Sequence, residues 1–267
     1  MTNLCLLPQE TLDHIVDFLH DEPEALKTCC FVSKSWIPRT RKHLFAEIKF
    51  RSVKDFSLWE KAFPDPSNSP AHHTRSMVVH CDSLALTGVY RLIEIFPRVA
   101  RLKVFWTSFH GNSHQVVTAS TLEEVSFAPF HRLSSTLKSL HMVFLILPYR
   151  QIFDLVRSSP LLEDLALFGV SMPSGGGGDS HGPQTATTLT LPPLTGCLEL
   201  HMRRGMEQPM RHLLDPPGSL HFRKLALSWF GEDDLRWITE LVGKCTDTLE
   251  CLDLDCHPPC TFVSVLC

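Results

Sequence analysis

Residues 162–167 read Leu-Glu-Asp-Leu-Ala-Leu, and the same spacing of apolar residues returns in residues 222–227, Phe-Arg-Lys-Leu-Ala-Leu, and 249–254, Leu-Glu-Cys-Leu-Asp-Leu. The last two apolar positions of each hexapeptide are separated by one residue, so in an extended strand their side chains point to the same face. The pattern therefore predicts short strands that bury one face against a core.

Further copies of this pattern occur throughout the chain after residue 45. The middle apolar residues of the copies are Ile48, Met77, Leu102, Val125, Leu140, Leu165, Leu198, Leu225 and Leu252. Neighbouring copies are 15 to 33 residues apart, and most spacings fall in the range of about 20–29 residues that is typical of leucine-rich repeats. The longest interval contains the glycine run 175–178, which predicts a flexible loop insertion near residues 171–193.

Each strand needs a return segment on the other side of the array, and three segments have helical spacing. They are residues 84–96, 149–158 and 233–245. Strand, helix and strand at this period predict parallel pairing, so residues 46–267 are predicted to form an α/β domain, an irregular leucine-rich-repeat solenoid. The alternative is an ordinary layer of helices on a parallel sheet. No polar capping repeat follows Leu254, so we expect either a truncated chain or an apolar tail that folds back.

Residues 1–45 have the periodicity of helices instead. One apolar stripe of a first helix, residues 9–20, is formed by Leu12, Ile15, Val16 and Leu19. A second helix is predicted to begin at Asp21, with Glu24 completing a capping box, and a third covers residues 33–45. About 40 residues make a marginal domain, so such a unit needs a neighbouring surface to cover its apolar side chains.

This N-terminal segment resembles an F-box. The matching residues are Leu7-Pro8-x-Glu10-x-Leu12-x-x-Ile15-x-x-x-Leu19, followed by Leu26-x-x-Cys29-x-x-Val32-Ser33-x-x-Trp36. The similarity covers residues 6–45 and implies a three-helix unit that docks to a Skp-type adaptor and, through it, to a cullin ubiquitin ligase. The adaptor contacts that the resemblance implies are Leu7, Pro8, Leu12, Ile15, Val32 and Trp36. The alternative is that this segment is a helical cap on the following domain.

The two parts together look like an F-box/leucine-rich-repeat receptor, which implies a non-catalytic substrate-recognition subunit of an SCF-type ubiquitin ligase. A repeat scaffold without a ligase role is the alternative. In a solenoid, the residues that flank the middle apolar positions would meet the protein substrate. Candidates for this role are Lys103, Phe105, Ser126, His141, Phe168 and His201. Their mixed charge and the formal net charge of -4 favour a protein partner over nucleic acid.

Catalytic and metal-binding patterns are weak in this sequence. The glycine run lacks the Lys-Ser/Thr of a phosphate loop, and no His-Glu-x-x-His occurs. The best metal candidate is the group Cys251, Cys256, His257 and Cys260, whose spacing suits zinc poorly. Asp253 and Asp255 alternate with leucines and are predicted to lie on a solvent-facing strand edge. We therefore expect no cofactor and no metal, and keep a metal-dependent or thiol enzyme as a third hypothesis.

The cysteines and the apolar runs bear on the compartment. Several of the 10 Cys lie within apolar periodic segments, where a cysteine acts as a small hydrophobic residue. No secretory signal is recognised at the N-terminus, and no stretch approaches the roughly 18 apolar residues of a membrane span. We therefore expect free thiols, no membrane association, and a cytoplasmic or nuclear protein.

Overall fold

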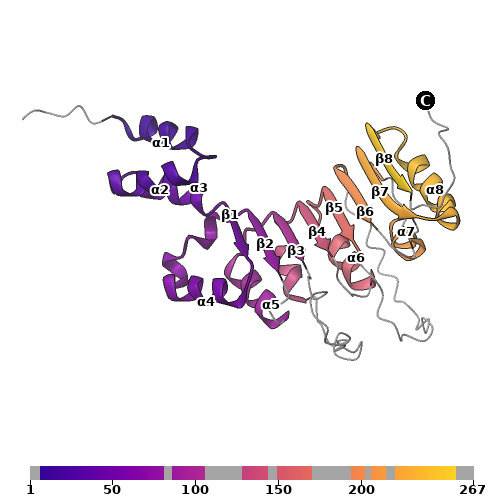
Figure 1. Ribbon diagram of the computed structural model, residues 1–267, viewed down its shortest axis with the longest axis horizontal. Helices are drawn as coiled ribbons and strands as arrows, with labels where there is room; N and C mark the ends of the chain where they lie inside the picture. The colour runs from indigo at the N-terminus through magenta and orange to yellow at the C-terminus, as the bar shows by residue number, and fades with distance from the viewer. Residues whose placement is uncertain are drawn as a thin grey trace, which may run out of the picture.

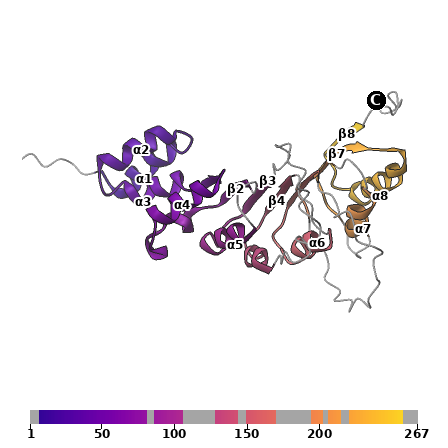
Figure 2. The same ribbon diagram turned by 60° about the horizontal axis from the view of Figure 1, so that its bottom comes forward.

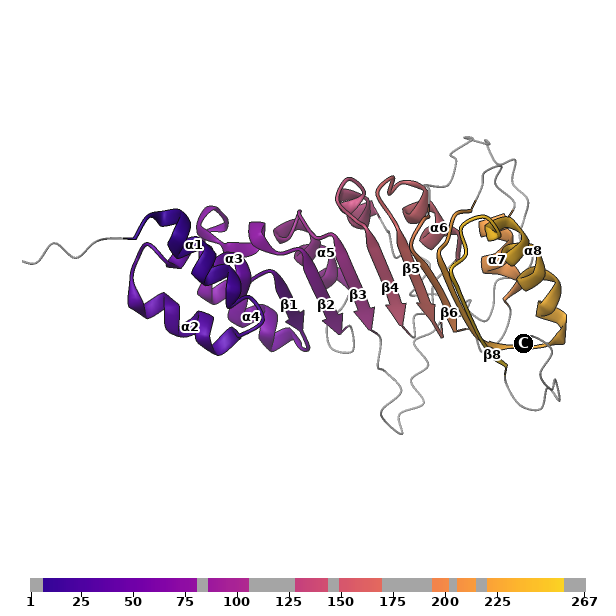
Figure 3. The ribbon, with the colours of Figure 1, turned by 90° about the horizontal axis from the view of Figure 1, so that it is seen from above.

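A parallel sheet, with a helical unit at its N-terminal end, makes up most of the computed structural model (Figure 1). The structure describes residues 7–80, 86–105, 128–143, 149–169, 194–201, 206–214 and 220–256. The sheet has eight strands that pair in the order of the sequence, β1 to β8, so each strand lies beside its successor along an elongated molecule (Figure 3). The predicted α/β class and parallel pairing are confirmed.

The apolar hexapeptides form the strands. Their bounds are β1 Glu47–Phe50, β2 Ser76–His80, β3 Arg101–Phe105, β4 Ser139–Val143, β5 Asp164–Phe168, β6 Cys197–His201, β7 Lys224–Phe230 and β8 Cys251–Cys256. One row of register partners joins Ile48, Met77, Leu102, Leu140, Leu165, Leu198, Leu225 and Leu252. The copies centred on these residues are therefore structurally equivalent. Val125 lies outside the described residues, and β3 pairs directly with β4.

A repeated hydrogen-bond pattern sets where each strand begins. The carbonyl oxygen of Ala46, just before β1, accepts from the backbone N–H groups of Arg75 and Ser76 at 2.9 and 3.0 Å. Arg75, Ala100, Lys138, Gly196 and Arg223 each accept two successive N–H groups of the next repeat in the same way. The side chains of three threonines reinforce the pattern by donating to a carbonyl one repeat earlier: Thr74 to Phe45, Thr136 to Val99 and Thr248 to Phe222.

The return segments lie on one side of the sheet (Figure 2). They are the helices α4 Val53–Ala62, α5 Leu86–Ile95, α6 Tyr149–Arg157, α7 Glu207–Leu214 and α8 Leu235–Cys245, with 3₁₀ turns at Pro66–Asn68, Pro70–His73, Ala128–Leu133 and Glu232–Asp234. The three predicted helices correspond to α5, α6 and α8. Sequence reasoning missed α4 and α7, although Ser52 and Asp55 form a capping box at the start of α4.

The inward side chains of the strands and the helices form one continuous core. Met77, Leu102, Leu140, Leu165 and Leu198 are fully buried between the sheet and the helices. At the first repeat the core is aromatic: the ring of Trp59 lies 5.0 Å from that of Phe96 and 5.7 Å from that of Phe45, measured between centroids. Because Phe45 directly follows the last N-terminal helix, this cluster connects the helical unit to the sheet.

The N-terminal unit consists of α1 Gln9–Phe18, α2 Pro23–Val32 and α3 Ile37–Leu44. The three predicted helices are present, and α3 starts later than expected, with Pro38 in its first turn. The predicted capping box at Asp21 is wrong: Glu22 precedes the helix without a side-chain cap, and Glu24 instead pairs with Lys27 at 2.6 Å.

A polar cluster joins α1 to α3. Arg39 donates two hydrogen bonds to the carboxylate of Asp17, one of them from Nε to Oδ1 at 2.6 Å, and Nε2 of His43 lies 2.6 Å from the same Oδ1. The hydrogen bond from Arg39, followed by that from His43, holds the pKa of Asp17 well below its usual range. The apolar core of this unit is small, with Val16, Leu26 and Cys29 buried, so the cluster adds polar contacts between α1 and α3 where apolar burial is limited.

We predict that Asp17→Asn destabilises the helical unit by about 1–2 kcal/mol, because the amide has no negative charge and only one acceptor oxygen for the contacts with Arg39 and His43. In the wild type the same stabilisation is present above the unfolded pKa near 3.9, and it is lost as the pH falls toward the lowered pKa of the folded state. Amide hydrogen exchange in α1 and α3, at neutral and at acidic pH, measures both effects. Asp21→Asn is the control, since Asp21 is 85% exposed, and equal effects of the two variants would contradict the prediction.

A second prediction concerns Gly196, which directly precedes β6. A Cβ atom at this position would meet a side-chain oxygen of Asp164 and lie 2.9 Å from the carbonyl oxygen of Glu163, so Gly196→Ala should cost about 1–3 kcal/mol. Gly243→Ala in α8 is the control: its Cβ meets nothing within 4 Å, and it should stabilise the helix by about 0.5–1 kcal/mol. The midpoints of urea denaturation should move in opposite directions, and a tolerated Gly196→Ala would contradict the close packing.

Candidate interaction surfaces

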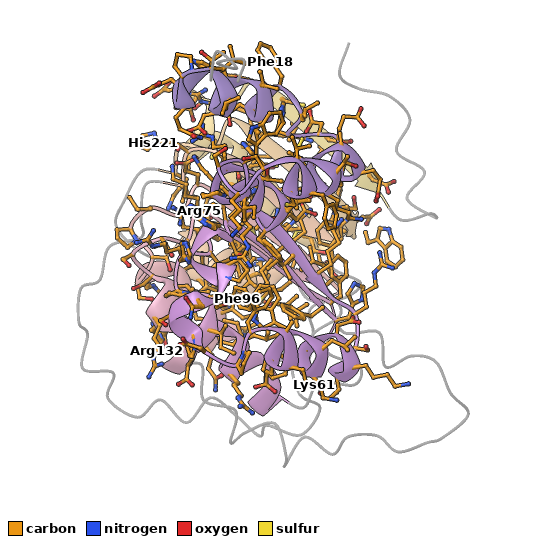
Figure 4. The ribbon with its side chains drawn as sticks, turned by 90° about the vertical axis from the view of Figure 1, so that its left-hand side faces the viewer. Phe18, Lys61, Arg75, Phe96, Arg132 and His221 are labelled. Carbon is orange, nitrogen blue, oxygen red and sulfur yellow. The ribbon has the colours of Figure 1, made fainter. Side chains whose placement is uncertain are left out.

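Large apolar side chains are exposed on the helical unit. Phe18 at the end of α1 is 85% exposed, and Phe31 near the end of α2 is 90% exposed. Ile15 lies one turn before Phe18 and shares its side of α1, and Val32 follows Phe31; both are exposed as well. Figure 4 shows Phe18 at the upper edge of the molecule, away from the buried Phe96 near the centre of the view. We refer to these exposed residues of the helical unit, together with Leu7, as the apolar end.

The residues that the F-box resemblance implies as adaptor contacts divide into two groups. Leu7, Pro8, Ile15 and Val32 are exposed, whereas Leu12 and Trp36 are half-buried. The carbonyl oxygen of Trp36 accepts the Oγ1 hydroxyl of Thr40 at 2.8 Å, at the start of α3. Sequence reasoning missed Phe18 and Phe31. The spacing of Phe18 from Ile15 is the signal that could have found the first of them.

The second surface is the open face of the sheet, opposite the helices (Figure 2). Here the outward residues of successive strands lie in register: Lys49, Val78, Lys103, His141, Ala166, Glu199, Ala226 and Asp253. A cleft of about 740 Å³ crosses β1–β4 on this face. It is lined mainly by Glu47, Lys49, Arg51, Val78, His80, Arg101, Lys103, Phe105 and His141.

The predicted substrate-binding residues lie on this face where the structure describes them. Lys103, Phe105 and His141 line the cleft, and Phe168 and His201 occupy the continuing rows on β5 and β6. Ser126 lies outside the described residues. The structure thus brings together side chains that are nearly 100 residues apart in the sequence.

Pairs of aromatic rings stack across adjacent strands of the open face. The rings of His80 and Phe105 lie 5.0 Å apart at 13° to one another, and those of Phe168 and His201 lie 4.1 Å apart at 14°. Burial lowers the pKa of His201, and burial followed by the nearby Lys103 lowers that of His141. Both imidazoles are therefore mainly neutral at pH 7, and they contribute hydrogen-bonding and stacking surface rather than charge.

Trp229, at the C-terminal end of β7, has an unusual backbone conformation. It has a φ of 69° and lies at an irregularity in the pairing of β7 with β8. A bulky residue rarely adopts this backbone conformation. The irregularity turns Trp229 outward, where it is 38% exposed, while the neighbouring Phe230 is buried in the core. Of the two aromatic residues that the sequence places together, only Trp229 is therefore available to a partner.

Two cysteines of the described chain, Cys197 and Cys245, have thiols that resist ionisation. Burial raises the pKa of Cys197 to about 12 and also raises that of Cys245, so neither is an activated nucleophile. Within the described ranges, no group of three or more His, Cys, Asp or Glu residues could hold a metal ion. His257 and Cys260 of the sequence-based zinc candidate lie outside those ranges. Asp253 and Asp255 are exposed on the edge strand β8, as predicted, and the alternating Leu252 and Leu254 are exposed as well.

In the part that the structure describes, no helix combines the length and apolar character needed to cross a membrane. Compared with known proteins, the chain matches no protein-family model, and no curated protein sequence matches it.

Proposed function

We propose that this chain is the substrate-recognition subunit of an SCF-type ubiquitin ligase. In this proposal the helical unit is an F-box that binds a Skp-type adaptor, and the sheet domain is an irregular leucine-rich-repeat array that holds a protein substrate on its open face. The observation that carries the proposal is the apolar end, where Phe18, Phe31, Ile15 and Val32 are exposed on a unit that has a very small core of its own.

The energetics of the apolar end support a docking role. Fully burying a phenylalanine side chain is worth about 1.5–3 kcal/mol, so two of them supply roughly 3–6 kcal/mol toward association before its entropic costs. Aromatic residues are also enriched at the centres of protein interfaces. Exposed aromatic residues of this size therefore favour a partner surface over a simple cap on the following domain.

The positions of the two surfaces support binding of the adaptor and of the substrate at separate sites. The apolar end lies at one extremity of the elongated molecule, and the strands extend away from it (Figure 1). An adaptor bound to α1 and α2 would leave the open face of β1–β8 accessible to a second protein. The aromatic pairs and the mixed charges of that face suit a protein partner.

We predict that Phe18→Asp together with Phe31→Asp lowers the affinity for a Skp-type adaptor about 100-fold or more, because two buried anchors would become desolvated charges. Isothermal titration of the full chain with a purified adaptor measures this loss. Both side chains are almost fully exposed, so the variant should fold, which circular dichroism checks.

The matched control is Leu58→Asp together with Leu161→Asp, which places the same charges on exposed leucines outside the helical unit, 64% and 48% exposed. This variant should bind the adaptor as the wild type does. If both variants lose binding equally, or if the well-folded wild type binds no adaptor, the ligase role is overturned and a repeat scaffold becomes the better account.

A further inference from the structure

The charges of the open face are separated along the sheet. On the side of β1–β3, the basic residues Lys49, Arg51, Arg101 and Lys103 outnumber the single acidic residue Glu47. Toward β8, the acidic residues Asp164, Glu199, Asp253 and Asp255 outnumber Lys224. Asp253 and Asp255 both act electrostatically on His201, which places them on the same face. The face therefore has a basic half and an acidic half, although the chain as a whole carries a net charge of -4.

The basic half coincides with the cleft. Lys49 pairs with Glu47 at 2.9 Å, with both side chains about half exposed. Among the residues that the structure describes, no ion pair neutralises Arg51, Arg101 or Lys103. Because Lys49 and Lys103 are separated by two strand spacings, they lie about 10 Å apart. Cations at this separation repel one another weakly, and a bound anionic group between them would relieve that repulsion.

The floor of the cleft is apolar and aromatic. Val78 lies between Lys49 and Lys103 in the register row, and the stacked rings of His80 and Phe105 border it. Such a floor suits the carbon atoms of a peptide whose acidic side chains reach the surrounding cations. At the other side of the cleft, His141 is mainly neutral at pH 7 and separates the basic half from the acidic half.

We propose that this cleft binds an extended segment of the partner protein that is rich in aspartate and glutamate, and that the residues following it, neutral or basic, lie over β5–β8. This inference rests on the proposed function, in that the segment belongs to the recognised substrate. The four strands β1–β4 span about 14 Å, which an extended chain covers with about four or five residues. The acidic patch that the partner needs is therefore short.

The acidic half of the face argues for a peptide over a nucleic acid. A nucleic acid strand carries phosphates along its whole length, so one long enough to cross the sheet would place them beside Glu199 and Asp253. A peptide can change its charge within a few residues and match both halves. Charge complementarity of this kind determines the orientation of the bound segment as well as its affinity.

The test uses the full chain and a fluorescein-labelled peptide of about five glutamates, a glycine linker and about five lysines, followed by fluorescence anisotropy. We expect this mixed peptide to bind more tightly than an all-glutamate peptide of the same length, and an oligothymidylate to bind least. The affinity should fall as NaCl rises above about 0.1 M, since exposed charges are then screened.

Charge reversal identifies the cleft as the site. Arg101→Glu with Lys103→Glu should weaken binding of the mixed peptide about tenfold or more. Lys61→Glu with Arg98→Glu is the matched control, because both residues are exposed and neither lines the cleft; Figure 4 shows Lys61 extending away from the molecule. This control should change the affinity less than about twofold.

Three outcomes would overturn the inference: no binding of the mixed peptide to the wild type, equal loss in the two charge-reversal variants, or tighter binding of the oligothymidylate. The last result would mark the face as a nucleic-acid surface. Adaptor binding measured on the same Arg101/Lys103 variant separates this inference from the ligase role. If the wild type binds the adaptor but not the mixed peptide, only the inference about the cleft is refuted. If it binds the mixed peptide but not the adaptor, only the ligase role is refuted.

Discussion

The pair of hydrogen bonds that each repeat donates to the carbonyl group before the preceding strand is the constraint on which the rest of the sheet depends. At the step from β1 to β2 this acceptor is Ala46, and the same geometry recurs as far as Arg223 and β8. Because every strand begins in the same register relative to its neighbour, residues at equivalent positions of the hexapeptides lie side by side. The one departure is at β6, where the N–H of Cys197 bonds to the Asp164 side chain at 2.8 Å instead of to a backbone carbonyl. This departure is why a glycine precedes Cys197.

The fixed register has two consequences that together create the candidate binding surface. The apolar positions of β1 to β7 form continuous buried rows that the helices cover, whereas Leu252 and Leu254 of the edge strand β8 are 37% and 39% exposed. The positions between them form equally continuous rows on the opposite face. A residue there gains neighbours from other strands, as Lys103 does from Val78 and His141. The separation of charge along the open face is therefore a property of the stacked array and not of any single strand.

The helical unit follows a different physical principle. Its buried apolar residues are few, and the cluster of Asp17 with Arg39 and His43 fixes α1 against α3 through charged hydrogen bonds. The side chains of Phe18 and Phe31 remain unburied in this unit. Polar contacts between α1 and α3 allow the unit to keep aromatic residues exposed elsewhere on its surface. Because it buries few apolar residues, the unit depends for much of its stability on a partner or on the adjoining Phe45–Trp59 contact.

The sequence by itself determined the strands, because alternation of apolar residues at a period of two is a local property, and the equivalence of Ile48 with Leu252 could be predicted from spacing alone. It also located α5, α6 and α8, whose apolar residues follow the helical period. The exposure of Phe18 and Phe31, the direct pairing of β3 with β4, and the separation of Lys49 and Lys103 from Glu199 and Asp253 were decided only by the tertiary structure. The physical reason is that exposure and strand neighbours depend on contacts between distant segments, whereas periodicity depends only on the residues within one segment.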